Sequence, residues 1–245
     1  MSSYSFFARY YDSLTSNVDY PSIAKAIDGY VSERKPASNI LVDVACGTGS
    51  LCVELSKLGY DVIGTDSSCE MLSEAVKKAY DGEKPILFLN QSMDELDLYG
   101  TVGVAVCTLD SINHVTNSAQ IDTAFSKISL FLEKDGLFIF DVNSLYKHNV
   151  ILADNTYVYD CEDVYCVWQN STENGKTTIS LDFFESDGNA YYRSSESFCE
   201  VAYSMQEIEQ LLAKNGLKVI AKYDDYTNNP LKEDTQRIVY VAGKV

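Results

Sequence analysis

Basic residues are scarce in this chain. Its 245 residues include 19 lysines and arginines against 36 aspartates and glutamates, which gives a formal net charge of -17. This charge repels a phosphate backbone and no run of basic residues forms a local patch, so we expect no nucleic-acid partner. Apolar runs of membrane length and a basic-then-apolar leader are also absent. We therefore expect neither a membrane span nor a secretory signal.

Histidine is also scarce, with two residues beside seven cysteines. The cysteines are scattered, and Cys161 and Cys166 are too far apart for a C-x-x-C motif, so we predict no metal site. An odd number of scattered cysteines is typical of reduced thiols, which predicts a cytoplasmic location. The length suits one large domain or one domain with an insertion, and nothing in the sequence indicates an oligomeric state.

The stretch that organises the chain is residues 39–51, NILVDVACGTGSL. The apolar run at 40–44 predicts a strand buried on both faces, and the helical apolar spacing that begins at Leu51 predicts a helix directly after it. Small residues occupy the turn between them at alternate positions, namely Ala45, Gly47 and Gly49. A turn with so few side chains lets a ligand lie against the backbone and the free N–H groups of the helix.

Two ligands compete for this turn. A dinucleotide would require the G-x-G-x-x-G pattern, but Cys52 stands where the third glycine belongs and Asp43 would oppose a pyrophosphate. The sulfonium and ammonium groups of S-adenosylmethionine would instead be attracted by a nearby carboxylate. The spacing of Asp43, Ala45, Gly47 and Gly49 resembles the first motif of the class I methyltransferases that use this cofactor.

The rest of the sequence predicts a doubly wound α/β fold. Aromatic residues around Phe7 precede the first expected element, a helix from Pro21. Strands are expected to alternate with helices, which predicts a Rossmann-like, mostly parallel, seven-stranded sheet with strands at 40–44, 61–66, 85–89, 102–109, 137–140, 217–223 and 237–241. The residues that end these strands should converge on one cleft.

The alternation of strands and helices stops in the next part of the chain. Strand-like runs occur there at 164–168, 177–184 and 191–201, separated by Asn-Gly and Asp-Gly turns, which predicts an inserted antiparallel β-sheet cap. We assign residues 1–149 and 202–245 to the core and 150–201 to the insert, which would cover the acceptor site.

Asp66 ends the second predicted strand. It follows the glycine turn near the spacing of about 20 residues at which an acid accepts ribose hydroxyls. The alternative is an ordinary acid at a helix start, because Ser67 and Glu70 form a capping-box pattern there.

Further segments strengthen the resemblance to small bacterial class I methyltransferases of undetermined substrate and to amino-sugar N-methyltransferases. They are FARYYDSL at 7–14, DYP at 19–21, DVACGTG at 43–49, DSSCEML at 66–72, LDSIN at 109–113 and FDVNS at 140–144. The resemblance implies S-adenosylmethionine as cofactor and methyl transfer to a small-molecule acceptor, either an amine or a hydroxyl. A cofactor-binding sensor without turnover and a nicotinamide-dependent oxidoreductase are the alternatives.

The resemblance also implies roles for single residues. Ala45, Cys46 and Gly47 would approach the methionine part of the cofactor. Asp43 would attract its ammonium, directly or through water, and Asp66 would accept the ribose hydroxyls. Met71 and Met93 would pack against the adenine, and Tyr11 and Tyr20 would close over the methionine. The other expected cofactor-binding residues follow these motifs, namely Gly49, Ser67, Gln91, Ser92 and Leu109.

Three residues near the predicted cleft are candidate proton acceptors, namely Asp110, His114 and Asp141. His114 would titrate in the useful pH range if unperturbed, although it could equally be a hydrogen-bonded loop histidine. The chain also departs from the related pattern E-x-H-x-x-R, since Phe198 and Val201 replace its histidine and arginine. These departures concern the acceptor rather than the cofactor.

Overall fold

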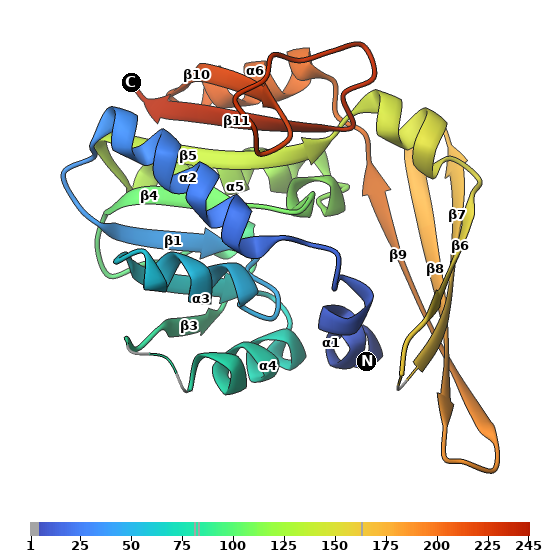
Figure 1. Ribbon diagram of the computed structural model, residues 1–245. Helices are drawn as coiled ribbons and strands as arrows, with labels where there is room; N and C mark the ends of the chain where they lie inside the picture. The colour runs from blue at the N-terminus through green and yellow to red at the C-terminus, as the bar shows by residue number, and fades with distance from the viewer. Residues whose placement is uncertain (1–4, 81, 83, 163) are drawn as a thin grey trace.

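The computed structural model describes residues 5–80, 82, 84–162 and 164–245, and a seven-stranded sheet forms its centre (Figure 1). The strand order is β10-β11-β5-β4-β1-β2-β3, and every pair is parallel except the two that β11 makes. The strands are β1 (Ile40–Val44), β2 (Asp61–Asp66), β3 (Leu87–Asn90), β4 (Val102–Cys107), β5 (Leu132–Asn143), β10 (Leu217–Asp224) and β11 (Arg237–Lys244). The predicted Rossmann-like, mostly parallel sheet is confirmed.

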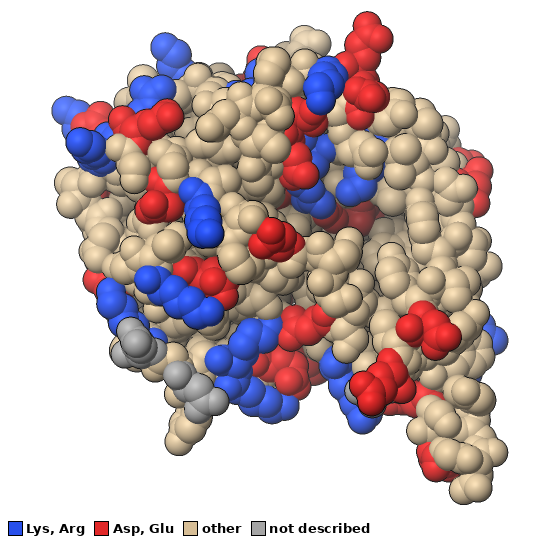
Figure 2. Space-filling view, in the orientation of Figure 1, with Lys and Arg blue, Asp and Glu red and all other residues tan. Residues whose placement is uncertain are grey.

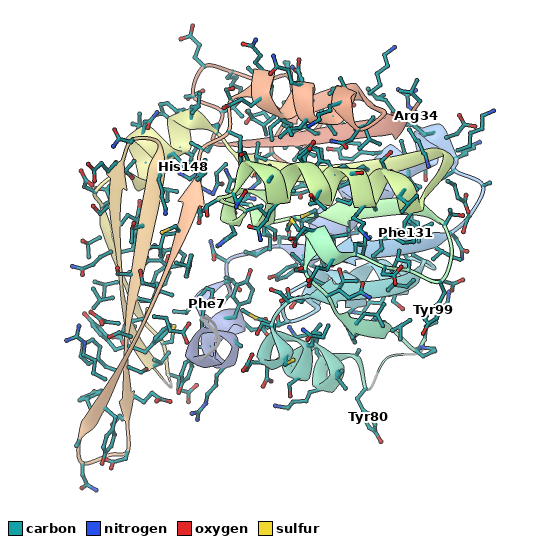
Figure 3. The ribbon with its side chains drawn as sticks, turned by 180° about the vertical axis from the view of Figure 1, so that it is seen from behind. Phe7, Arg34, Tyr80, Tyr99, Phe131 and His148 are labelled. Atoms are coloured by element: carbon teal, nitrogen blue, oxygen red, sulfur yellow. The ribbon has the colours of Figure 1, made fainter. Side chains whose placement is uncertain are left out.

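Helices cover both faces of this sheet. Figure 1 looks onto the face covered by α2 and α3, and Figure 3 onto the face covered by α5. One buried cluster joins the first face to α2 and α3, and a second joins the opposite face to α5 and α6. The helices are α2 (Tyr20–Arg34), α3 (Ser50–Lys57), α4 (Cys69–Ala79), α5 (Ser118–Phe131) and α6 (Met205–Lys214). No helix of the described residues is long and apolar enough to cross a membrane.

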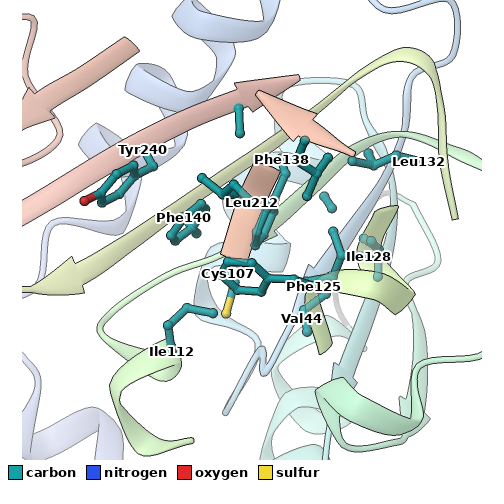
Figure 4. Close-up of a cluster of buried hydrophobic side chains, with 14 of the residues drawn as sticks. Val44, Cys107, Ile112, Phe125, Ile128, Leu132, Phe138, Phe140, Leu212 and Tyr240 are labelled. Atoms are coloured by element: carbon teal, nitrogen blue, oxygen red, sulfur yellow. The ribbon is translucent and has the colours of Figure 1, made fainter. Parts of the chain in front are cut away.

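Aromatic packing holds the strands that lead to the cleft (Figure 4). Phe125 of α5 meets the ring of Phe138 edge-on, with centroids 5.6 Å apart, and Phe140 stacks on Tyr240 of β11 at 5.0 Å. All four residues are fully buried. Burying one such ring contributes about 1.5–3 kcal/mol, and a favourable ring pair adds about 0.5–1.5 kcal/mol. The cluster therefore keeps β5 and β11 in register up to the end that carries Asp141.

The insert forms a second, antiparallel sheet of four strands in the order β6-β7-β8-β9. These strands are β6 (Thr156–Asp160), β7 (Val164–Glu173), β8 (Lys176–Ser186) and β9 (Tyr191–Val201). Asn174 and Gly175, both at positive φ, make the β7–β8 turn, as the Asn-Gly signal predicts. In Figure 1 the insert stands beyond the carboxyl ends of the parallel strands.

A helix that the sequence analysis missed fills the space between core and insert. Phe7, Tyr10 and Leu14 of α1 (Ser5–Leu14) are buried against the inner face of the insert. The expectation that no regular element precedes α2 is therefore wrong. Apolar residues three and four positions apart in this segment carried the signal, because that spacing gives a helix one apolar face.

Ionic contacts also hold α1 on both sides. Arg9 donates to Glu185 of β8 at 2.9 Å, and the Tyr10 hydroxyl donates to the same carboxylate. Asp12 pairs with Lys78 of α4 at 2.7 Å. The helix thus bridges the insert and the core.

Several strand boundaries differ from the sequence prediction: β4 ends at Cys107 rather than Leu109, β5 at Asn143 rather than Phe140, and β11 at Lys244 rather than Val241. β3 begins at Leu87 rather than Pro85, and β5 begins at Leu132 rather than Leu137. Asp135, at φ 65°, lies where the register between β4 and β5 shifts, so the predicted turn is an irregularity inside a longer strand. The seven cysteines are all free thiols.

Gly64 of β2 offers a test of the packing beneath the glycine turn. A Cβ there would lie 2.7 Å from the Phe88 ring and 2.9 Å from the Cys46 sulfur. We expect Gly64→Ala to lower the free energy of unfolding by about 1–3 kcal/mol through overpacking. Urea denaturation measures the change.

The matched control is Gly29→Ala in the exposed middle of α2, where a Cβ would meet nothing within 4 Å. This variant should be more stable than the parent by about 0.5–1 kcal/mol, because alanine is the better helix former. Equal effects of the two substitutions would contradict the packing described for Gly64.

Candidate active site

A cavity of about 360 Å³ opens at the carboxyl ends of the parallel strands, within the range of small-molecule sites. Figure 2 shows the surface hollowed where the core meets the insert, with basic and acidic side chains close together there. Most of the predicted site residues line this cavity, namely Tyr11, Ala45, Gly47, Asp66, Ser67, Met71, Gln91, Ser92, Met93, Leu109 and His114.

The glycine turn exposes its backbone to the cavity. Ala45 and Gly47 both have positive φ, at 59° and 54°, and a Cβ on Gly47 would meet nothing within 4 Å. Gly49 has a different reason to be glycine, because its Cβ would lie 2.9 Å from that of Ala75 on α4. One glycine therefore leaves room for a ligand, and the other permits close packing of the helices.

Asp66 connects the glycine turn to the start of α4. Its carboxylate accepts the backbone N–H of Gly47 and that of Ser68, each at 2.8 Å. Burial raises the pKa of Asp66, and these two hydrogen bonds oppose that rise. Each carboxylate oxygen has a further acceptor position. The predicted ribose contact is compatible with this arrangement and stays a prediction.

Asp43, Cys46, Gly49 and Tyr20 do not line the cavity. Asp43 is buried below the turn, where the Cys52 thiol donates to it at 3.2 Å and burial raises its pKa to about 7. Asp43 therefore lies beneath the turn rather than at the cavity surface, and its predicted attraction for the cofactor ammonium, directly or through water, stays a prediction. Tyr20 is hydrogen-bonded to Tyr11, which does line the cavity, and its predicted place over the methionine stays a prediction.

Asp141 and Asp110 also lie outside the cavity lining, because both are bound to Arg237. Asp141 accepts the backbone N–H groups of Leu109 and Asp110, each at 2.7 Å, and the hydroxyl of Tyr226. Burial would raise the pKa of Asp110, but Arg237 and its other cationic neighbours outweigh burial and lower it. Of the three candidate proton acceptors, His114 lines the cavity and these two carboxylates do not, and the catalytic role of each stays a prediction.

His114 reaches the cavity from the 3-10 turn η2 (Ser111–His114) that follows β4. Its ring packs against Phe198 of β9, with centroids 5.1 Å apart. Its Nε2 atom lies 3.7 Å from Oε1 of Glu200 and 3.9 Å from Oδ2 of Asp110. Burial lowers the pKa of His114, and Asp110 opposes that change. Burial therefore favours the neutral form of this imidazole.

Behind His114 lies a buried polar group that sequence reasoning missed. Glu200 of β9 and His148 of the π-helical turn η3 (Lys147–Leu152) are 3% and 0% exposed, and 3.6 Å separates their Oε2 and Nε2 atoms. Figure 3 places His148 at the junction of core and insert. Asp110, His114 and Glu200 thus form a compact cluster, in which one side-chain atom of each residue lies within 4.8 Å of the others.

The sequence analysis also missed several residues of the cavity lining, namely Phe7, Ser68, Asp94, Ser111, Val115 and Gln120. Phe7 belongs to the helical stripe of α1, and Ser68, Asp94, Ser111 and Val115 adjoin residues that were identified. Only tertiary contact brings Gln120 of α5 to this place. Ser68 also caps α4, because its hydroxyl accepts the N–H of Met71.

The charges around the cavity favour a cationic ligand. Among the described residues that line it, Asp66 and Asp94 carry carboxylates and there is no lysine or arginine. A pyrophosphate would be repelled, whereas a sulfonium and an ammonium would be attracted. The residues present, with the open backbone at Gly47, fit S-adenosylmethionine.

Comparison with known proteins also indicates a methyltransferase. A family described as "Methyltransferase domain" matches residues 41–136. YqeM of Bacillus subtilis (strain 168), named as a candidate methyltransferase, is 30% identical over 98% of this chain and 97% of its own. The solved structure of an S-adenosylmethionine-dependent methyltransferase from Clostridium acetobutylicum ATCC 824 is 32% identical over 98% of both chains, with a TM-score of 0.89.

More distant matches carry names that state what those proteins methylate. The glycine/sarcosine N-methyltransferase of Halorhodospira halochloris is 22% identical over 93% of this chain and 84% of its own. The sugar N-methyltransferase KedS8 from Streptoalloteichus is 20% identical over 94% of this chain and 92% of its own, with a TM-score of 0.78. With the cavity at the strand ends and the extended matches at 30% identity and above, this chain belongs to the S-adenosylmethionine-dependent methyltransferases.

Proposed function

We propose that this methyltransferase acts on the nitrogen of a small amine. The observation that carries the proposal is the neutral imidazole of His114 at the cavity, 3.7 Å from the carboxylate of Glu200. A protonated amine must lose a proton before its nitrogen can accept a methyl group, and the methylated product must lose one before it can accept a second. A neutral imidazole beside a carboxylate can take that proton. The N-methyltransferase names of the distant relatives agree with this choice over a hydroxyl.

The cofactor would occupy the part of the cavity between the glycine turn and α4. Ala45 and Gly47 would approach the methionine portion, Asp66 the ribose, and Met71 and Met93 the adenine, beside Ser92. When bound, S-adenosylmethionine supplies an electrophilic methyl group with a good leaving group attached. The protein's remaining tasks are to align the acceptor, exclude water and remove a proton.

The acceptor would lie at the other end of the cavity, near His114, with α1 and the insert covering it. Phe7 and Tyr11 of α1 line the cavity, and Phe198 of the insert packs on His114. These apolar surfaces would exclude water around the acceptor nitrogen. We keep residues 150–201 as the cap of the acceptor site and a reducing cytoplasm as the location.

An acceptor screen tests the proposal. We expect release of S-adenosylhomocysteine with at least one amine among glycine, sarcosine and nucleotide-linked 3-amino sugars. The matched hydroxyl compounds glycolate and the 3-hydroxy sugars should give none, because they lack the amine nitrogen. Mass spectrometry of the product locates the added methyl group. Methylation of the hydroxyl compounds alone would overturn the proposal, and cofactor binding without any turnover would favour the sensor.

A second test concerns how Asp66 holds the cofactor. Hydrogen bonds to a charged carboxylate are worth roughly 1.5–3 kcal/mol each. We expect Asp66→Ala to weaken binding of S-adenosylhomocysteine by about ten- to a thousandfold, or about 1.4–4 kcal/mol. Loss of the hydrogen bonds from Gly47 and Ser68 would add to the effect by loosening the turn. Isothermal titration measures the affinity.

Asp61→Ala is the control, because Asp61 lies at the opposite end of β2 from Asp66 and its side chain is 61% exposed. Its affinity for S-adenosylhomocysteine should equal that of the parent. If Asp66→Ala also binds with unchanged affinity, the ribose is held by other residues.

A further inference from the structure

Glu200 is a deeply buried carboxylate beside the acceptor end of the cavity, and no lysine or arginine among the described residues forms an ion pair with it. It is 3% exposed. Nδ2 of Asn143 lies 3.4 Å from its carboxylate, and the Nε2 atoms of His148 and His114 lie 3.6 and 3.7 Å from it. These separations are long for hydrogen bonds to a carboxylate. Burial and the nearby Asp110 raise the pKa of Glu200 to about 8.

The geometry of β9 directs Glu200 toward His114. Residues two apart on a strand share a face, and Phe198, two positions earlier, packs directly on the His114 ring. Asn113, next to His114, donates to the carbonyl oxygen of Val201 at 2.8 Å and so holds η2 against the end of this strand. The distance between Glu200 and His114 is therefore set by contacts on both elements.

The surrounding charges come from four further elements. Asp110 precedes η2, Asp141 lies two residues before the end of β5, Arg237 begins β11, and Lys147 and His148 belong to η3. Arg237 is occupied by Asp110 and Asp141, so it does not pair with Glu200. Burial lowers the pKa of His148 to about 4 and also lowers that of Lys147. His148 is therefore neutral at physiological pH, and its Nδ1 lies 3.0 Å from the hydroxyl oxygen of Thr177.

We propose that Glu200 is a positioning residue that holds His114 as the proton acceptor for the amine and shares the proton that His114 removes. The proposal rests on N-methylation as the function. As the acceptor nitrogen forms its bond to the methyl carbon, the carbon–sulfur bond breaks, and its electron pair leaves with the sulfur of S-adenosylhomocysteine. The N–H bond of the acceptor breaks as well, and the proton passes to the imidazole of His114. Glu200 stabilises the resulting imidazolium or takes the proton itself, and the proton then leaves to water.

Histidine NMR tests this arrangement without any acceptor. The chain has two histidines, so a ¹³C-histidine sample gives two ring signals, which His114→Gln assigns. Both rings are neutral above pH 7, and both lie within 4 Å of the Glu200 carboxylate. We expect both Cε1–H signals to shift with a shared inflection near pH 8 as Glu200 loses its proton. This inflection should vanish in Glu200→Gln.

The matched control is Glu173→Gln, which makes the same change at an exposed position of β7 and should retain the inflection. Persistence of the inflection in Glu200→Gln would overturn the proposal. If that variant does not fold, the parent titration decides, because the absence of a shared inflection would also overturn it. A shift of both signals on adding Mg²⁺ or Mn²⁺, reversed by a chelator, would instead assign the cluster to a cation.

Turnover of an amine identified by the screen supplies the second measurement. Glu200→Gln should lower kcat on the order of 100-fold with little change in KM. The parent's kcat should fall as the pH drops below about 8, since the ionised form of Glu200 is lost there, and Glu200→Gln should lack this limb. Unchanged kcat in the variant would overturn the role of Glu200 and leave N-methylation standing. A screen without amine turnover would overturn N-methylation, while the NMR titration would still report the coupling of Glu200 to His114.

Discussion

The buried carboxylate of Asp141 is the constraint on which the acceptor end of this protein depends. It binds two consecutive backbone N–H groups after β4, the guanidinium of Arg237 and the hydroxyl of Tyr226. Leu109 and Asp110 both adopt positive φ, which costs free energy unless surrounding contacts compensate. Because Asp141 supplies those contacts, the chain turns sharply after β4 and delivers His114 to the cavity.

A similar device organises the cofactor end. Asp66 binds the N–H groups of Gly47 and Ser68, so one carboxylate joins the turn after β1 to the helix start after β2. In both places an acid at the end of a strand orders the neighbouring loop through the backbone. An acid that serves the fold in this way can still offer its remaining acceptor positions to a ligand. The two ends of the cavity thus use the same chemistry for different purposes.

The insert determines the burial and the charge environment of His114 at the acceptor end. Its inner face packs on α1 through Phe183 and Tyr10, and its last strand carries Phe198 and Glu200 to His114. A core of parallel strands alone would leave His114 in contact with solvent on that side. Burial by the insert keeps the imidazole neutral and raises the pKa of Glu200, so the second sheet sets the acid–base properties as well as the shape of the site.

The sequence by itself determined the alternation of strands and helices, the glycine turn, the acid after β2 and the separate antiparallel sheet. These features depend on local periodicity and on the conformational range of glycine, which a single segment expresses. Tertiary structure alone decided which acids are available. In the sequence, Asp43, Asp110 and Asp141 look equivalent to Asp66. In the structure, Asp43 is buried and Arg237 binds both Asp110 and Asp141, so none of the three lines the cavity. Glu200 and His148 meet His114 because an inserted sheet folds back onto the strand ends, and contacts between such distant segments leave no periodic trace in the sequence.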